Sequence, residues 1–366
     1  MNILYTNFHP RGGGGHDTYI KTLINIEDNT ENFNYSVACP VSSHLYQSLN
    51  NETGINLLPL DFPGKPKDII EIIKNTIKLA RFIRENSIDI IHTNGSADNR
   101  IVLYARLFSR KKFKIVHTKH NSLSCRGWLS RRRLFSTNDA IIIVSQSIYD
   151  VLGRRSKNNA KFHLIRNGID TNKWVPPKNN PEYEKIILMS IAGTDIYKGW
   201  HHLINAINML PDTIKHRFLV KIAGHPPDTA TVEKLTGTTQ LPEWASFCGF
   251  LTEPQDALKE ADIGFVLSTD IETISFACRE MMSAGLPVIV SDYGGLAENI
   301  TAEVDGWVTP AGDTVALSHL LLNIITLSPA ELLNMKKNAR KKSEMEFGKE
   351  MMINKTHLIY KKVMTN

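Results

Sequence analysis

Long apolar runs are absent from the sequence. Its apolar stretches are only strand-sized, as at Ala140–Val144, whereas a bilayer-spanning helix needs about 20 apolar residues. The opening residues, Met1–Thr6, have the pattern of a buried strand and not the basic and then apolar pattern of a signal peptide. We therefore expect no membrane-spanning segment and a cytoplasmic protein.

Closely spaced cysteines are also absent. The four cysteines, at positions 39, 125, 248 and 278, lie far apart and form no C-x-x-C pair. This spacing indicates reduced, mostly buried thiols, and it argues against both a disulfide scaffold and a zinc site.

Acidic residues are missing from residues 100–133, which hold eleven Lys and Arg side chains. The whole chain has a net charge of +6, so the remainder sums to −5. A positive field of this density attracts anions such as lipid headgroups, nucleic acid or an acidic glycan. The alternative is a solvated surface whose counter-charges come from elsewhere in the fold.

The 366 residues predict roughly two domains of about 150 to 200 residues each. Strand-like and helix-like segments alternate, which predicts α/β domains with parallel, doubly wound sheets. The predicted strands are 3–6, 35–38, 88–92, 114–117, 140–144, 185–192, 221–223, 246–248, 263–267 and 288–290, and the predicted helices include 17–26, 69–85, 99–108 and 200–209. A breaker-rich linker at 176–181 separates domains at 1–175 and 176–349.

Four consecutive glycines, including Gly13 and Gly14, follow the first predicted strand and precede a helix. Glycine lets the backbone approach a ligand closely, and the helix start offers free amides to a diphosphate or a sugar. The pattern is not G-x-G-x-x-G, and Cys39-Pro40 ends the second strand without an acidic residue, so a nicotinamide cofactor is disfavoured. A plain flexible loop is the alternative.

Two further loops follow predicted strands, where ligands of open α/β sheets bind. His120 lies just past the strand at 114–117 and can exchange hydrogen bonds in a cleft, whereas His117 is expected to be a packed strand residue. Lys198 lies between the strand at 185–192 and a helix, where it can neutralise a phosphate, although Lys-Gly before a helix is also common.

Two carboxylates follow the strand at 263–267. Glu272 lies in the loop, and Thr273 or Ser275 is expected to cap a helix that contains Glu280. The two acids are then separated by about two helical turns, which suits different sugar hydroxyls, and the helix start offers amides to an anion. Two ordinary helix acids are the alternative. Gly294-Gly295 is a further tight turn, either for a ligand phosphate or purely structural.

Together these residues resemble glycosyltransferase family 4, whose members are retaining nucleotide-sugar enzymes with the glycosyltransferase-B fold. The most specific part is Glu272-x7-Glu280, followed by Ala284–Ile289, Gly294-Gly295 and Glu298. Supporting parts are the glycine loop, Thr118-x-His120, Val144-Ser145, Asn167–Asp170 and Lys198-Gly199. The resemblance implies two Rossmann-like domains facing a cleft, with a terminal helix at 350–366 that joins the first domain.

The resemblance implies transfer of a sugar from a nucleotide diphosphate, expected to be UDP, with retention and without metal or cofactor. It assigns catalysis to His120, Lys198 and Glu272. Donor binding falls to Gly13, Gly14, Gly193, Lys198, Thr273, Ile274, Ser275 and Glu280. The chain departs from the family where Gly193 replaces a frequent Arg, for which Arg279 or Arg11 is a candidate substitute, and where Thr273-Ile-Ser275 replaces Gly-Phe-Gly.

The segments Tyr5–His16 and Ile274–Glu280 also resemble lipopolysaccharide-assembly members. This implies a lipopolysaccharide core or another lipid-linked glycan as acceptor, at the inner face of the cytoplasmic membrane. Acceptor and anionic membrane contacts are expected at Arg126, Arg131, Arg132 and Arg133.

Three alternatives remain open at this stage. A nucleotide-sugar 2-epimerase has the same fold. A catalytically impaired glycan-binding relative would account for Gly193 and the 273–275 loop. Nucleic-acid binding is disfavoured, because residues 100–133 have few interleaved aromatics and no nucleic-acid-binding motif.

Overall fold

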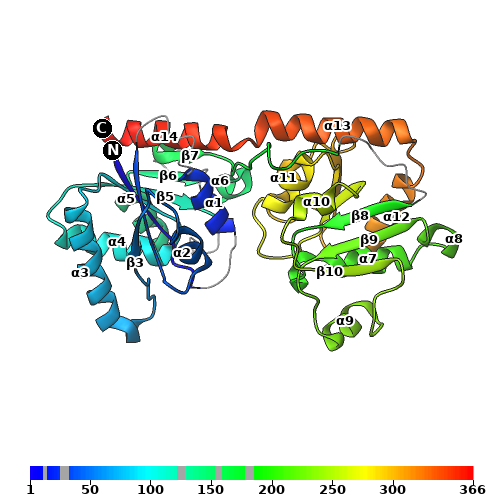
Figure 1. The fold of residues 1–366 in the computed structure, drawn as a ribbon, viewed down its shortest axis with the longest axis horizontal. Coiled ribbons are helices and arrows are strands. Elements are labelled where there is room, and N and C mark those ends of the chain that lie inside the picture. The colour runs from blue at the N-terminus through cyan, green and yellow to red at the C-terminus, as the bar shows by residue number, and fades with distance from the viewer. Residues whose placement is uncertain (11–14, 25–32, 122–127, 153–158, 178–184, 366) are drawn as a thin grey trace. The chain divides into compact units, whose positions relative to one another are not determined.

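The computed structural model describes residues 1–10, 15–24, 33–121, 128–152, 159–177 and 185–365. It divides into two compact units, of which unit 1 comprises residues 1–168 with 350–366 and unit 2 comprises residues 169–349. Each unit is built on a parallel sheet flanked by helices, which confirms the predicted α/β class (Figure 1).

Unit 1 contains a seven-stranded parallel sheet in the order β3-β2-β1-β4-β5-β6-β7. Its strands are β1 (Asn2–Thr6), β2 (Asn34–Cys39), β3 (Asn56–Pro59), β4 (Ile90–Thr93), β5 (Lys114–Lys119), β6 (Ala140–Ile143) and β7 (Phe162–Leu164). Its helices are α1 (Gly15–Leu23), α2 (His44–Leu49), α3 (Ile69–Glu85), α4 (Ser96–Phe108), α5 (Trp128–Thr137), α6 (Gln146–Leu152) and, from residue 350 on, α14 (Lys349–Thr365).

Unit 2 contains a six-stranded parallel sheet in the order β10-β9-β8-β11-β12-β13. Its strands are β8 (Ile186–Ser190), β9 (Phe218–Ala223), β10 (Ala245–Gly249), β11 (Ile263–Val266), β12 (Val288–Ser291) and β13 (Gly306–Thr309). Its helices are α7 (Trp200–Asn208), α8 (Asp212–Lys215), α9 (Thr229–Thr236), α10 (Pro254–Leu258), α11 (Phe276–Ser283), α12 (Thr314–Ile324) and α13 (Pro329–Glu346).

Alternate residues of the central strand β8 enter two different apolar clusters. Leu188 packs with α7 and α12, whereas Ile187 and Met189 pack with α11. Because successive strand residues point to opposite faces, the sheet of unit 2 is buried on both faces, as a parallel sheet requires. In unit 1, helices α3 and α4 pack their apolar sides against one face of the sheet.

Several strands were missed by the sequence analysis. β3, β7 and β13 have three or four residues each, and β3 and β7 form the two edges of the sheet in unit 1. Short edge strands need little apolar periodicity, so the sequence carries no clear signal for them. Two helices start earlier than predicted, α1 at Gly15 and α4 at Ser96.

The division between the units lies slightly before the predicted boundary at 175/176. Ile169 donates its amide to Phe347 O (2.8 Å) and accepts from Lys349 N (2.8 Å), and Trp174 is buried in a core cluster of unit 2. These contacts tie residues 169–174 to unit 2. Most of the predicted linker, from residue 178 on, lies outside the described residues.

Among the described residues, no single helix has both the length and the apolar character needed to cross a bilayer. Helices α12 and α13 are long and apolar enough only when they are taken together, and the chain bends by 115° between them. Cys39 and Cys278 are buried and Cys248 is exposed, each as a free thiol, while Cys125 lies outside the described residues.

The last helix, α14, is fastened to unit 1 by a directed chain of hydrogen bonds. Tyr360 Oη donates to Tyr5 Oη (3.0 Å), so its oxygen accepts from His92 Nδ1 (2.5 Å). His92 Nε2 then accepts from Thr118 Oγ1 (2.6 Å). Burial lowers the pKa of His92 to about 3, which keeps the ring neutral. Because the Tyr360 proton is given to Tyr5, the ring proton of His92 is on Nδ1. Helix α14 therefore completes the core beside β1 and β4 (Figure 1).

We expect Tyr360→Phe to lower the unfolding free energy of unit 1 by about 1–3 kcal/mol, because it leaves a buried histidine N–H and the Tyr5 hydroxyl without their partner. Leu358→Ala is the control, since Leu358 is largely exposed on the same helix. Urea unfolding measures the free energy, and hydrogen exchange of the amides in β1 and β4 measures the local protection of these strands. Equal protection in the two variants would contradict the role given to this network.

Candidate active site

An ion pair joins two loops at the carboxyl edge of the sheet in unit 2. Lys198 ends a short 3-10 helix after β8, and Glu272 lies in the loop after β11. Lys198 Nζ is 2.7 Å from Glu272 Oε2, with side chains that are only 16% and 9% exposed. The structure therefore brings together two residues that the sequence analysis placed in one site.

The carboxylate of this pair is held by its own loop. Ser268 Oγ donates to Glu272 Oε2 (3.1 Å), and Thr269 N donates to Tyr197 O (2.8 Å), which ties the loop to the residue before Lys198. Both side chains are largely buried, and their contact holds the two loops that carry them together.

Two glycines make the close approach of these loops sterically feasible. Gly199 has φ +73°, and a Cβ there would lie 2.0 Å from Leu267 O. Gly294 has φ +64°, and a Cβ there would lie 2.2 Å from Glu272 O. Gly294 thus has a structural role, because the turn packs directly on the backbone of Glu272.

The N-terminus of α11 follows this loop. Ser275 is the N-cap, with Oγ accepting from Cys278 N (3.3 Å), so one of the two predicted caps is confirmed. Asn299 Nδ2 donates to Ile274 O (2.7 Å), and the Ile274 side chain is buried. Residues 273–275 therefore form a fixed turn whose backbone leads into the positive end of the helix dipole.

Glu280 lies further along α11 in unit 2. Burial raises the pKa of its carboxyl to about 7, and Lys173 offsets part of that increase. A carboxyl group with a pKa raised in this way is a candidate for a functional position.

Arg279 does not take the place of the arginine that the family often has where this chain has Gly193. Arg279 is fully buried, its Nε donates to Asn299 Oδ1 (2.8 Å), and its guanidinium lies 4.3 Å from the centre of the Phe347 ring. It therefore holds α11 to its neighbours. Gly193 has φ +89° with open space around its Cβ position, and Arg11 lies outside the described residues.

His120, in unit 1, follows β5 and takes part in a polar network. Asn94 Nδ2 donates to Thr6 O (3.1 Å), so Asn94 Oδ1 is the acceptor for His120 Nε2 (3.1 Å). Burial holds the pKa of His120 well below its usual range, so the ring is neutral with the proton on Nε2. His117 is buried within β5, as predicted.

Asn94, Asp98 and His16 were missed by the sequence analysis. Asp98 Oδ2 accepts from Thr6 Oγ1 (2.6 Å) and from Asn94 N (2.8 Å), and the His16 ring lies 4.1 Å from that of His120. The available signal was the turn dipeptide Asn94-Gly95, which begins two residues after the predicted strand at 88–92 and marks a loop at the ligand-binding edge.

The basic segment is partly neutralised from outside itself. Lys111 pairs with Asp89 (3.2 Å), and Lys114 and Arg106 lie 3.9 Å and 3.8 Å from Asp139. The counter-charge alternative therefore holds for these three side chains. Arg131, Arg132 and Arg133 lie on α5, where Arg131 also donates to Val151 O (3.0 Å). Gly13, Gly14 and Arg126 lie outside the described residues.

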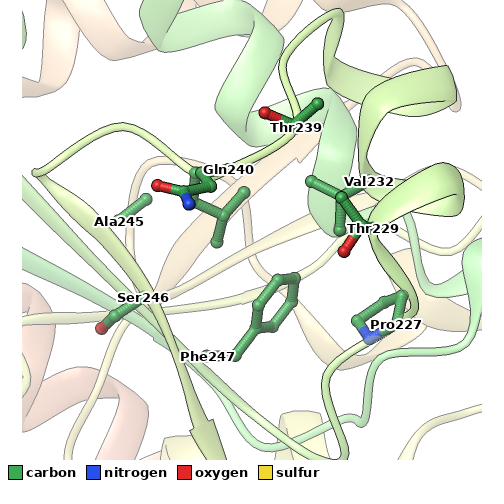
Figure 2. Close-up of a pocket in the computed structure, with 9 residues that line it drawn as sticks. Pro227, Thr229, Val232, Thr239, Gln240, Ala245, Ser246 and Phe247 are labelled. Atoms are coloured by element: carbon green, nitrogen blue, oxygen red, sulfur yellow. The ribbon is translucent and has the colours of Figure 1, made fainter.

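A cavity of about 340 Å³ lies elsewhere in unit 2, between α9 and the edge strand β10. Figure 2 shows Phe247 and Gln240 beside Val232, Thr229 and Pro227 in its lining. No charged side chain lines it, and none of the predicted site residues does, so it carries no part of the chemistry considered above.

No group of three or more His, Cys, Asp or Glu side chains that could hold a metal ion occurs in the described part of the chain.

Comparisons with known proteins match both halves of the chain. The family described as Glycosyltransferase Family 4 matches residues 14–173, and the family described as Glycosyl transferases group 1 matches residues 170–342. Over 228 residues the chain is 28% identical to the amylovoran biosynthesis glycosyltransferase AmsK of Erwinia amylovora, covering 60% of this chain and 55% of that protein. It is 26% identical to the O-antigen biosynthesis glycosyltransferase WclY of Escherichia coli, covering 68% and 74%. The match thus spans just over half of the first relative.

Solved structures show the same fold. A glycosyltransferase from Rickettsia africae superposes with a TM-score of 0.84 at 19% identity, covering 100% of this chain and 99% of that one. The Anabaena protein HepE, solved in complex with UDP and glucose, superposes with a TM-score of 0.80 at 16% identity, covering 99% and 100%. These likenesses confirm the predicted two-domain, Rossmann-like fold.

We expect Gly294→Ala to destabilise unit 2 more than Gly237→Ala does. Both glycines have positive φ, +64° and +76°, so both variants lose about 1–2 kcal/mol to backbone strain. Only at Gly294 does the new Cβ meet a backbone oxygen, that of Glu272, which adds about 1–3 kcal/mol. Calorimetry of the two variants measures the difference, and equal melting temperatures would rule out the packing role of Gly294.

Proposed function

Because the chain belongs to the glycosyltransferases, with a family 4 half followed by a group 1 half, we propose that it is a retaining enzyme. It transfers a sugar from a UDP-sugar to a lipopolysaccharide core or another lipid-linked glycan and releases UDP. The transferred group is proposed to be a hexose or an N-acetylhexosamine. The observation that carries the proposal is the Lys198–Glu272 pair beside the N-terminus of α11.

Lys198 is the proposed electrostatic catalyst. As the bond from the anomeric carbon to the diphosphate breaks, negative charge grows on the departing oxygens. The ammonium of Lys198 and the amides at the start of α11 stabilise that charge without a metal ion. Glu272 keeps Lys198 in position before the donor arrives, and it accepts a hydrogen bond from a donor hydroxyl once the diphosphate has drawn the lysine away.

Glu280 is proposed to accept hydrogen bonds from the two ribose hydroxyls of the donor. The neutral ring of His120 is proposed to exchange a hydrogen bond with the donor sugar, which adds no charge next to the departing diphosphate. Asn94 then acts as a positioning residue that holds the His120 ring and its tautomer. Gly13, Gly14, Gly193 and the 273–275 turn complete the proposed donor site by backbone contacts.

The proposed acceptor places the enzyme at the inner face of the cytoplasmic membrane. Support comes from the relatives named for amylovoran and O-antigen biosynthesis and from the basic residues of the 100–133 segment, among them Arg131, Arg132 and Arg133. No observation favours the epimerase or the glycan-binding alternative, and neither is proposed.

We expect Lys198→Ala to lower kcat by about 100- to 1000-fold, since one charged donor to the leaving group is lost. Lys221→Ala is the matched control, because Lys221 is also a lysine of unit 2 in an ion pair, with Glu260 at 2.8 Å, but sits on strand β9. A panel of nucleotide sugars is first screened by thermal shift, and transfer is then followed by UDP release. Similar kcat values for the two variants would refute the role of Lys198.

We expect donor affinity to rise as pH increases through about 7, because ionised Glu280 is a stronger acceptor for ribose hydroxyls than the protonated acid. Stability should change in the opposite direction. The folded pKa lies above the ordinary 4.5, so the native state binds the proton more tightly and loses stability as pH rises between these values.

Glu280→Gln should remove both pH trends, and Glu280→Ala should abolish transfer while leaving the fold intact. Calorimetric titration with UDP at several pH values measures the affinity. Any trend that persists in Glu280→Gln belongs to the ligand, and an identical trend in both proteins would contradict the assignment of Glu280.

A further inference from the structure

Helix α3 exposes an apolar face as well as burying one. Ile69, Ile70, Ile73 and Ile77 are 50–66% exposed. Residues 69, 73 and 77 are four apart, so they form one stripe along the helix, with Ile70 beside it. The neighbouring stripe, about a quarter turn around the helix, is buried in the core of unit 1 and consists of Ile72, Thr76, Leu79, Ala80 and Ile83.

The exposed stripe of α3 continues onto the neighbouring helix α4. On the far flank of α3, Asn75 and Lys78 reach Asp61 O (2.9 Å) and Pro59 O (2.6 Å) beside the edge strand β3, so the isoleucines lie on the flank nearer α4. On α4, Arg106 reaches back to Thr137 O (3.3 Å) at the end of α5, so the opposite flank faces α3.

The side chains exposed on and beside that flank of α4 are also apolar. Tyr104, Leu107 and Phe108 are 41%, 78% and 57% exposed. We call the combined surface the α3–α4 ridge, which consists of Ile69, Ile70, Ile73, Ile77, Tyr104, Leu107 and Phe108. Figure 1 shows the two helices next to each other on one side of unit 1.

The surroundings of the ridge are basic. Residues 65–85 contain six basic and three acidic side chains, and one of the acids, Glu71, is paired with Lys74 at 3.2 Å. Residues 96–112 contain five basic side chains and one acid, Asp98, which is buried. Two of the five, Arg106 and Lys111, face Asp139 and Asp89, and the other three are Arg100, Arg110 and Lys112. A second copy docked on this face would bring like charges together, whereas an anionic surface would be attracted to it.

We propose that the α3–α4 ridge is a docking surface for an anionic lipid bilayer, into whose headgroup region its isoleucine, leucine and aromatic side chains insert. An apolar stripe bordered by lysine and arginine is the pattern by which a helix lies in a membrane interface. The surrounding cations gain from the negative surface potential of such a bilayer. The inference deepens the proposed function, since a lipid-linked acceptor lies at that interface.

The topology places the α3 end of this surface near the candidate site of unit 1. In a parallel sheet with crossover helices, α3 and α4 both begin at the carboxyl edge of the strands. Asn94 and His120 follow strands at the same edge. Arg100, near the start of α4, also reaches Gly64 O (3.0 Å) just ahead of α3, which holds the two helix starts together. Docking would thus bring this edge close to lipid-linked molecules.

The test is binding of the full chain to vesicles of phosphatidylcholine with phosphatidylglycerol, compared with phosphatidylcholine alone. The variant is Ile70→Ser with Ile73→Ser and Ile77→Ser, since serine and isoleucine have similar helix propensities and all three positions are exposed. The control is Val315→Ser, at a position that is 50% exposed on α12 in unit 2.

We expect the native chain to bind the anionic vesicles, with binding weakened by salt, and the triple variant to partition at least about tenfold less while the control is unchanged. Absence of binding by the native chain, or equal binding by the triple variant, would overturn the proposal. So would a native dimer that the triple variant converts to a monomer, because the ridge would then be a contact between copies.

Vesicle binding needs no donor and no turnover, so its failure leaves the proposed reaction standing. A thermal shift with UDP, run on the same three proteins, reports the donor site separately. An equal shift in all three also shows that the substitutions have left the fold intact.

Discussion

The Lys198–Glu272 ion pair determines the geometry of the candidate site in unit 2. Neither ion is well solvated, so each relies on the other, and the loops that carry them must stay within reach. Gly199 makes this possible because no side chain fits between the two loops at its position, and Gly294 lets the loop after β12 pack on the backbone of Glu272. The start of α11 follows from the same constraint, since residues 273–275 leave Glu272 directly into the helix. A lysine, a carboxylate and a set of amides are thereby fixed before any ligand arrives.

Unit 1 depends on a different device, namely buried neutral histidines with defined tautomers. His92 is fixed by the tyrosine of α14, and His120 is fixed by Asn94. Burial disfavours the charged form of both rings, so their hydrogen bonds stay directional across the physiological pH range. The charged pair in unit 2 and the neutral histidines in unit 1 fit the proposed reaction, in which a charged diphosphate would leave an uncharged sugar.

The sequence was a good guide where a local pattern has one physical solution. The alternation of strands and helices required parallel sheets, and Ser275 before an apolar helical stretch was a recognisable cap. It was a poor guide where the answer depends on a distant neighbour. Arg279 was a candidate phosphate-binding cation in the sequence. In the structure it donates a hydrogen bond to Asn299 and its guanidinium lies over the ring of Phe347, both from later parts of the chain. The sequence predicted a helix at 69–85, but it could not distinguish the isoleucines that are exposed on α3 from those that are buried.

The order of elements along the chain has a consequence for biosynthesis. Unit 1 emerges first from the ribosome, but α14, which covers β1 and β4, is translated only after all of unit 2. Until then His92 and Tyr5 lack Tyr360 as a hydrogen-bond partner. The core of unit 1 is therefore completed only after unit 2 has been synthesised. During that interval the incomplete unit 1 is open to chaperone binding.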